Sequence, residues 1–419
     1  MAKTISANIG AITLNSTTSN YNPLTVLAGV TVTGAGSFGI SGDSSTIWTV
    51  TNFGTVIASA TSADGIVFST SAVLNNSGTA AHVYGKFAGV FMGGPGTVTN
   101  QGTIAGGYDG VGLIGGTLTN SGTAALVSGG TNGVYAPASS AAAVTNQGTI
   151  AGSSSGGKGV YLKGGGSVTN SAGAHISGGQ YGVLAKGTAI AVSNQGTISG
   201  ASIGIVFDGS GTITNSGTAA RITGSNQGVM SRNSAATVTN QGSILSTSGS
   251  GVYLHAGGAV TSSGTAALIS GANSGVFVGG AAGSVTHGGT ISGGAGYGVY
   301  LATGGAVTNS AAGALISGGV EFGAGGGTVN NGAGARITGV NAIFGQAGAA
   351  AATITNQGTI SGTNGINLNS GGAITNSGAA ARITATGYGV AVSGGNGTVT
   401  NQGSISGTSG GVAFGLAEQ

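Results

Sequence analysis

Two aspartates stand where a pair of carboxylates could act on a glycosidic bond. Asp64 and Asp109 each directly precede the glycine of a short apolar segment, and the two segments lie two steps apart in a repeat. If these segments are strands stacked about 4.8 Å apart, the carboxylates lie roughly 9–10 Å apart, near the spacing in inverting glycoside hydrolases. No cluster of Arg, Lys or aromatic residues accompanies the pair in register, and aspartate is common in turns. Polysaccharide cleavage is therefore the weakest functional hypothesis, and we predict no catalytic residues.

Three glycine-rich segments match known motifs without the structure that those motifs require. Residues 34–39, GAGSFG, match GxGxxG, but no helix is expected to follow and present its N-terminus to a phosphate. Residues 152–158, GSSSGGK, are followed by Gly159 instead of the Ser or Thr of a phosphate-binding loop. Residues 200–204, GASIG, match GxSxG without a strand-to-helix turn or evident His and Asp partners. We therefore predict no cofactor.

The composition excludes several classes of site. The chain has 419 residues, of which 4% are charged, and no cysteine. Without thiolates or a recurrent acidic residue, neither a thiolate metal site nor a calcium-binding repeat is expected. The nine Lys and Arg residues are spread along the chain, so nucleic acid is not a predicted partner. No apolar run is long enough for a membrane-spanning helix, and the low charge favours self-association.

A repeat must position these residues, and residues 98–116, VTNQGTIAGGYDGVGLIGG, represent it well. Three short runs, VTN, GTIA and GVGL, place aliphatic residues between small or polar neighbours, with glycines in the gaps. This pattern is typical of three short strands joined by tight turns. Sixteen copies at steps of about 23 residues predict an all-β fold, a right-handed parallel β-solenoid with three strands in each rung, or circuit, of the solenoid.

An asparagine ends the first strand of nearly every copy. Its amide can donate to the equivalent amide in one neighbouring rung and accept from that in the other, so we predict a structural ladder. Ser262 and His287 replace this asparagine in two consecutive copies, where we expect local weakening or a special corner, and we interpret His287 as a tolerated substitution. The ladder residues that we single out are Asn100, Asn120, Asn146, Asn170, Asn194, Asn215 and Asn240.

The two ends of the chain depart from the repeat. Residues 1–51 contain strand-like pieces and the single tryptophan, Trp48, and we predict that they form an N-terminal β cap on a solenoid body at 52–419. The last residues, GGVAFGLAEQ, complete a third strand with no evident cap. That end is therefore expected to be paired, covered or attached.

Two outward columns are the candidate interaction surfaces. One lies just before the buried aliphatic residue of the second strand, where Thr or Ser alternates with larger residues that include His82, His175, Arg221, Arg336 and Arg382. We interpret it as a solvated edge, or else as a lateral or anionic-polysaccharide contact. The other lies on the third strand and carries Tyr135, Tyr161, Tyr253, Phe277 and Tyr300. These rings either stabilise the sheet or offer a platform for sugars or a neighbouring rod.

The patterns VTNQGTISG and GVYLxxGGxVTNSG and the segment STIWTVTN resemble the glycine-rich β-strand repeats of bacterial autotransporter passenger regions and related surface proteins. The resemblance covers about residues 20–414. It implies a parallel β-solenoid displayed outside a bacterial cell as a stalk, adhesin or matrix component. The N-terminal residues MAKTISANIGAITLN contain no apolar run of signal-peptide length, so we expect a passenger fragment or a relative exported by another route.

These observations favour a non-enzymatic, extracellular or cell-surface structural protein. The low charge, the uncapped end and the outward rings indicate a rod that associates with itself, end to end or laterally, in a surface fibre or matrix. The alternative is an adhesin or glycan-binding stalk that uses the aromatic or arginine column. Its partner would be an extracellular polysaccharide.

Overall fold

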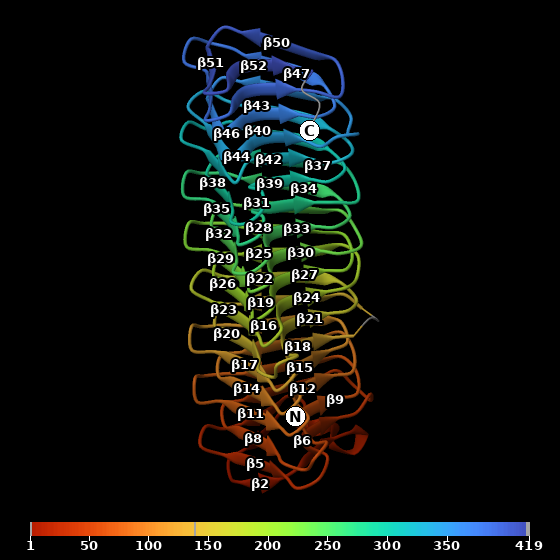
Figure 1. Ribbon diagram of the computed structural model, residues 1–419. Helices are drawn as coiled ribbons and strands as arrows, with labels where there is room; N and C mark the ends of the chain where they lie inside the picture. The colour runs from red at the N-terminus through yellow and green to blue at the C-terminus, as the bar shows by residue number, and fades with distance from the viewer. Residues whose placement is uncertain (1, 138–139, 416–419) are drawn as a thin grey trace. The chain divides into compact units, whose positions relative to one another are not determined.

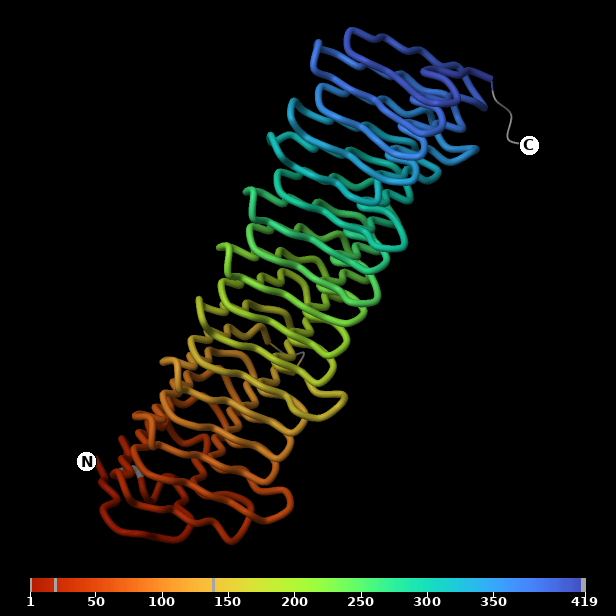
Figure 2. The backbone as a smooth tube through the Cα atoms, turned by 60° about the vertical axis from the view of Figure 1, so that its left-hand side comes forward, coloured from red at the N-terminus to blue at the C-terminus, as the bar shows by residue number. Residues whose placement is uncertain are grey.

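The computed structural model describes residues 2–137 and 140–415, and the chain divides after Gly209 into a first and a second unit. Each unit is a parallel β-solenoid (Figure 1). Figure 2 shows how the backbone of each unit passes through one rung after another. The described residues contain one short helical segment, the 3-10 helix η1 (Ser16–Tyr21). The predicted all-β, three-stranded solenoid is therefore confirmed.

The first unit has nine rungs, each with a first, second and third strand. The first strands are β1 (Lys3–Ile5), β4 (Leu24–Val26), β7 (Trp48–Asn52), β10 (Ala72–Asn76), β13 (Gly96–Asn100), β16 (Gly116–Asn120), β19 (Ala142–Asn146), β22 (Gly166–Asn170) and β25 (Ile190–Asn194). The second strands are β2 (Ile9–Gly10), β5 (Thr31–Gly34), β8 (Thr55–Ala58), β11 (His82–Gly85), β14 (Thr103–Gly106), β17 (Leu126–Gly129), β20 (Thr149–Gly152), β23 (His175–Gly178) and β26 (Thr197–Gly200). The third strands are β3 (Ile12–Leu14), β6 (Phe38–Gly42), β9 (Asp64–Phe68), β12 (Ala88–Met92), β15 (Asp109–Leu113), β18 (Asn132–Ala136), β21 (Lys158–Leu162), β24 (Tyr181–Ala185) and β27 (Ile203–Phe207).

The second unit repeats this arrangement in nine more rungs. Its first strands are β28 (Gly211–Asn215), β31 (Ala236–Asn240), β34 (Gly258–Ser262), β37 (Gly283–His287), β40 (Gly305–Asn309), β43 (Gly327–Asn331), β45 (Ala352–Asn356), β47 (Gly372–Asn376) and β50 (Gly397–Asn401). Its second strands are β29 (Arg221–Gly224), β32 (Ser243–Ser246), β35 (Leu268–Gly271), β38 (Thr290–Gly293), β41 (Leu315–Ser317), β48 (Arg382–Ala385) and β51 (Ser404–Gly407). Its third strands are β30 (Gln227–Ser231), β33 (Ser250–Leu254), β36 (Val276–Val278), β39 (Val299–Leu301), β42 (Val320–Phe322), β49 (Tyr388–Val392) and β52 (Gly410–Phe414). In two rungs the second and third strands merge into the long strands β44 (Arg336–Gly345) and β46 (Thr359–Leu368).

The described residues therefore contain eighteen rungs, and the predicted sixteen was too few. The two additional rungs lie within residues 3–42, where β1 pairs in parallel with β4, and β4 with β7. Ile5 and Val26 occupy the register position that Asn52 holds in the next rung, so alignment on asparagine could not find these rungs. The cap boundary at residue 51 stays a prediction, and residues 416–419 of the predicted C-terminal end lie outside the described part of the chain.

The hydrophobic core lies inside each rung and follows the predicted alternation. In β13 the side chain of Val98 is buried, whereas Thr97 and Thr99 are more exposed. Ile104 of β14 and the apolar residues that flank Tyr161 in β21 are fully buried. Each such side chain contributes about 1.5–3 kcal/mol on burial. Since a single rung is narrow, stability comes from stacking.

The asparagine ladder forms as predicted. Asn146 Nδ2 donates to Asn170 Oδ1 at 2.8 Å, and Asn146 Oδ1 accepts from Asn120 Nδ2 at 2.8 Å. The same amide nitrogen also donates to the carbonyl oxygens of Gly148 and His175, at 3.1 and 3.0 Å. Equivalent amide–amide bonds of 2.7–2.8 Å run from Asn52 to Asn194 in the first unit. In the second unit they join Asn215 to Asn240, and each asparagine from Asn309 to Asn401 to the next.

The ladder is interrupted at Ser262 and His287, also as predicted. Asn240 Nδ2 reaches the Ser262 hydroxyl at 3.3 Å, but His287 is only 1% exposed and neither of its ring nitrogens has a hydrogen-bond partner among the described residues. Asn309 Oδ1, in the next rung, is likewise buried and unpartnered there. Burial lowers the pKa of His287, against the smaller opposing effect of the Gly289 and Leu315 carbonyls. Three buried polar atoms are thus unsatisfied at one place.

Glycine is required inside the third strands as well as at the corners. A Cβ atom added at Gly182 would lie 2.6 Å from the carbonyl oxygen of Gly204 and 2.7 Å from Ile198 Cγ2, both in the following rung. The equivalent position is glycine in β9, β12, β15, β18 and β21, with the same obstruction at 2.6–2.7 Å. Successive rungs therefore approach each other too closely at this point for any side chain.

We expect Gly182→Ala to lower the stability of the first unit by about 2 kcal/mol, since the obstructing carbonyl belongs to the backbone and cannot rotate away. Gly156→Ala is the matched control, because a Cβ there meets nothing within 4 Å. Thermal unfolding followed by circular dichroism would measure both. Equal melting temperatures for the two variants would contradict the close approach.

Candidate functional site

The predicted aromatic column on the third strands is present in the first unit. Tyr135 and Tyr161 are paired in register on β18 and β21, with ring centroids 5.6 Å apart and planes tilted by 52°. One rung before Tyr135, the column is interrupted by Gly112, which has no side chain. A Cβ at Gly112 would lie 2.8 Å from Phe91 Cδ2, so the Phe91 ring leans over this glycine. The outward face is therefore hollow between Phe91 and Tyr135.

A second pair of rings borders this hollow. Phe87 and Tyr108 lie in the corners just before β12 and β15, and their rings stack in parallel, 5.4 Å between centroids and 3° between planes. Both are large apolar surfaces left in solvent, 44% and 47% exposed. Neither ring was predicted from the sequence as part of a site. The signal was available, because Phe87 and Tyr108 stand at the same offset before the glycine of their third strands.

The floor of the hollow is polar. Asp109 and Asn132 occupy the same register position on β15 and β18, are 5% and 4% exposed, and are joined by a bond of 2.8 Å from Asn132 Nδ2 to Asp109 Oδ1. Because the carboxylate needs a donor, this bond orients the amide and leaves Asn132 Oδ1 as an acceptor. That oxygen is buried and has no partner in the described part of the chain. A buried acceptor of this kind costs free energy until a donor reaches it.

Burial raises the pKa of Asp109 to about 6. The hydrogen bond from Asn132 opposes this effect, and the negative charge of Asp64 adds to it. Asp109 therefore changes its charge close to neutral pH, which an exposed aspartate does not do.

Two lysines stand over the tyrosines. Lys158 Nζ lies 5.8 Å from the centre of the Tyr161 ring, and Lys163 Nζ lies 5.4 and 5.5 Å from the rings of Tyr135 and Tyr161. A hydrogen bond with the Tyr135 side chain, and then the nearby Tyr161 group, raise the pKa of Lys163. Among residues 2–137 and 140–415, no ion pair joins either of these two lysines to a carboxylate.

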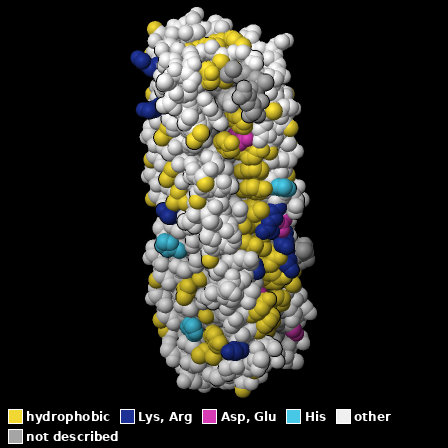
Figure 3. Space-filling model, in the orientation of Figure 1, with side chains coloured by type: hydrophobic (Ala, Val, Ile, Leu, Met, Phe, Trp, Pro, Cys, Tyr) yellow, Lys and Arg dark blue, Asp and Glu magenta, His cyan; other side chains and the backbone are white. Residues whose placement is uncertain are grey.

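These side chains together line a groove of about 300 Å³, which we call the aromatic groove. In the lower part of Figure 3, where the first unit lies, hydrophobic side chains gather on one side, with Lys and Arg side chains beside them. The groove is lined by Phe87, Phe91, Tyr108, Asp109, Thr131, Asn132, Tyr135, Lys158, Tyr161 and Lys163.

The structure corrects the interpretation of the two aspartates. Asp64 and Asp109 do share a register column, with Ala88 between them, as predicted. The expectation that no Lys or aromatic cluster accompanies them is wrong for Asp109, because residues from neighbouring rungs converge on it. Asp64 instead accepts a hydrogen bond from the Ala88 backbone N–H at 3.0 Å, and burial raises its pKa.

The aromatic column of the second unit is also in register. Tyr253 and Phe277 stack at 4.6 Å with planes 7° apart, and Phe277 meets Tyr300 edge to face at 5.2 Å. Glu321 follows Tyr300 in this column, is buried, and accepts a hydrogen bond of 2.6 Å from Gln346 Nε2. Burial, then a hydrogen bond with Glu321, raises the pKa of the adjacent Tyr297 to about 12. Here the rings cover one another, whereas in the first unit they border a groove.

The mixed column on the second strands lies outward, as predicted. His82 aligns with Thr55 and Thr103, and His175 aligns with Thr149 and Thr197. Arg221, Arg336 and Arg382 are exposed at the first position of their strands. Ser243 follows Arg221, Leu315 precedes Arg336, and Thr359 separates Arg336 from Arg382, so these arginines form no continuous cationic surface. Partial burial lowers the pKa of His82.

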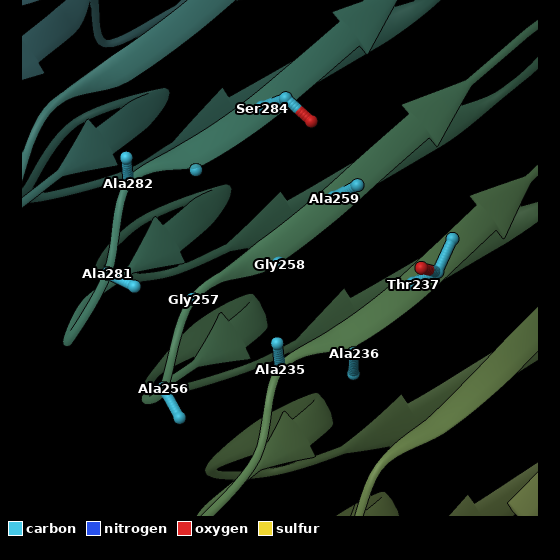
Figure 4. Close-up of a pocket in the computed structure, with 11 residues that line it drawn as sticks. Ala235, Ala236, Thr237, Ala256, Gly257, Gly258, Ala259, Ala281, Ala282 and Ser284 are labelled. Atoms are coloured by element: carbon cyan, nitrogen blue, oxygen red, sulfur yellow. The ribbon is translucent and has the colours of Figure 1, made fainter. Parts of the chain in front are cut away.

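Another hollow, of about 450 Å³, lies in the second unit before β31, β34 and β37 (Figure 4). Alanine and glycine dominate its lining, with Thr237 and Ser284 as its hydroxyl-bearing side chains. Figure 4 shows these two on separate strands with Ala259 on the strand between them. This hollow reflects missing side-chain volume and offers little for specific recognition.

The described ranges hold no candidate metal site, since no group of three or more His, Asp or Glu residues suited to a metal ion occurs within them. In the same ranges, no helix has the length and apolar character needed to cross a membrane. Comparisons with models of protein families, with curated proteins and with solved structures found no match.

Proposed function

We propose that this chain is a non-enzymatic, extracellular β-solenoid protein that binds polysaccharide through the aromatic groove. The observation that carries the proposal is the combination of solvent-exposed rings with a buried, incompletely satisfied polar pair, Asp109 and Asn132. Aromatic faces pack against the C–H faces of sugar rings, and polar groups in the floor bind their hydroxyls. The extracellular setting is proposed from the resemblance of the repeats to passenger regions.

The groove favours sugar binding over catalysis. Its lining contains one carboxylate, that of Asp109, whereas glycoside hydrolysis uses a pair that flanks the scissile bond. Asp64, the possible second carboxylate, is partly buried in another rung and engaged by a backbone donor. A groove with one titratable carboxyl, an amide and rings is suited to holding a sugar chain.

A glycan array tests the proposal. We expect the wild-type protein to bind at least one class of polysaccharide fragment, and Phe87→Ala combined with Tyr108→Ala to weaken that binding roughly tenfold, because each ring contributes about 0.5–1.5 kcal/mol. Tyr253→Ala, in the second unit, is the matched control and should bind as the wild type does. Absence of any glycan ligand would overturn the proposal, and release of sugar products dependent on Asp109 would contradict its non-enzymatic part.

Self-association is the second candidate function. It is supported by the contiguous rings of Tyr253, Phe277 and Tyr300 and by a surface with few charges to keep copies apart. Negative-stain electron microscopy of dilute protein would show fibres or bundles if these rings meet a second copy. Isolated particles at all concentrations would remove this candidate.

A further inference from the structure

We infer that the aromatic groove selects acidic sugars. Lys158 and Lys163 bind the carboxylate of a uronic acid residue, and Asn132 binds a hydroxyl group of the same saccharide. This inference rests on the proposed function and names the ligand class for that site. It follows from the placement of the two lysines and from the polarity of the floor.

The two lysines contact tyrosine rings, but no carboxylate of the described residues neutralises their charge. Both ammonium groups lie within 5.8 Å of the Tyr161 ring centre, so both border the groove beside this ring. Within the part of the chain that the structure describes, no carboxylate forms an ion pair with either of them. Two cations over adjacent rings attract an anion more strongly than either would alone, and the apolar rings reduce the water that competes with it.

The floor supplies the complementary acceptor. Asn132 Oδ1 is buried without a donor, and a sugar hydroxyl is a donor that can also rotate to suit it. A ligand that bears both a carboxylate and hydroxyl groups on one ring can therefore bind the lysines and the Asn132 amide at the same time. A simple sulfate ion, which has no hydrogen-bond donor, would satisfy the lysines but would leave the amide oxygen unpaired.

Asp109 makes this recognition depend on pH. Asn132 from β18 and Asp64 from β9 act on its carboxyl group, and Lys158, Lys163 and the tyrosines line the same groove. When ionised, Asp109 repels a bound carboxylate, and when protonated it does not. Since burial raises its pKa to about 6, acidic sugars should bind more tightly below this pH than above it.

Calorimetric titration of the full chain with a short oligomer of galacturonic acid, and with the matched galactose oligomer, tests the inference. At about pH 5 and low salt we expect the acidic oligomer to bind roughly tenfold more tightly than the neutral one, and the preference to shrink at about pH 8. Lys158→Gln combined with Lys163→Gln should reduce the ratio of acidic to neutral affinity roughly tenfold. Asp109→Asn should make the ratio independent of pH.

Lys186→Gln is the matched control, because Lys186 already pairs with Asp208 at 3.7 Å and does not line the groove, so it should keep the wild-type ratio. Equal binding of the acidic and neutral oligomers would overturn this inference and leave the proposed function standing. Equally tight binding of a sulfated oligomer would overturn the assignment of a uronic acid. Binding of none of these oligomers, together with an empty glycan array, would overturn the proposed function itself.

Discussion

Replacing Asn146 with alanine is expected to destabilise the rungs around it by about 4 kcal/mol. The side chain lies at the centre of five hydrogen bonds in the interior of the first unit. Its removal leaves Asn170 Oδ1 without its donor from the preceding rung and the Gly148 backbone N–H without an acceptor. Each buried group left unpaired costs about 1–3 kcal/mol, and the void adds to this cost.

Hydrogen exchange is the suitable measurement, because it reports the local opening of individual rungs as well as the unfolding of the whole unit. We expect amides in β16, β19 and β22 to lose protection in Asn146→Ala, with the effect fading over more distant rungs. Thr145→Ala, the neighbouring outward position, should change protection little. Similar losses in both variants would show that the ladder contributes less than its hydrogen bonds indicate.

The ladder and the alternation of buried and exposed residues could be predicted because they recur in each copy. An asparagine at a constant register position has one environment throughout, so its role follows from the period alone. The first two rungs were missed for the same reason. Ile5 and Val26 replace that asparagine, and η1 enlarges the corner of the first rung, so these copies keep the shape of the repeat without its consensus.

The aromatic groove was predicted only in part. Tyr135 and Tyr161 could be placed because they occupy the same position in their strands. Lys163 lies just after the end of β21, outside the repeated strand pattern, and Asp109 is bonded to Asn132 of the adjacent rung, so neither could be placed in the groove from the repeat. The hollow itself depends on Gly112, which has no side chain, whereas the rungs before and after it carry Phe91 and Tyr135 at this position. The sequence shows which side chains share a column. The sequence does not show which side chains of neighbouring rungs come together beside a position, such as Gly112, that has no side chain.

Restoring asparagine at both interrupted positions, Ser262→Asn with His287→Asn, is expected to stabilise the second unit by about 3 kcal/mol. The amide introduced by His287→Asn would donate to the unpartnered Asn309 Oδ1 and to the carbonyls that the imidazole faces. The amide introduced by Ser262→Asn would accept from Asn240 Nδ2 and donate to the new amide at position 287. The surrounding backbone already has the ladder register, because Ser262 pairs with His287 and His287 with Asn309.

A double-mutant cycle separates the contributions. The amide–amide bond between positions 262 and 287 exists only in the double variant, so its stabilisation should exceed the sum of the single variants by about 0.5–3 kcal/mol. Thermal and chemical unfolding of the four proteins would measure this difference. Additive or destabilising substitutions would mean that the serine and histidine pack better than asparagine in this part of the ladder.

The loss of stability at acidic pH independently tests the role of the buried His287 ring. Burial lowers its pKa below the ordinary value of 6.5, so the unfolded chain takes up a proton at a higher pH than the folded chain. The stability contributed by the neutral, buried ring is therefore fully present above about pH 6.5 and is lost as the pH falls from there through the folded pKa. Wild type and Ser262→Asn should share this loss, whereas His287→Asn should lack it. A loss of equal size in His287→Asn would assign the acid sensitivity to another group, and an unchanged neutral-pH stability would show that the unpaired nitrogens cost the fold nothing.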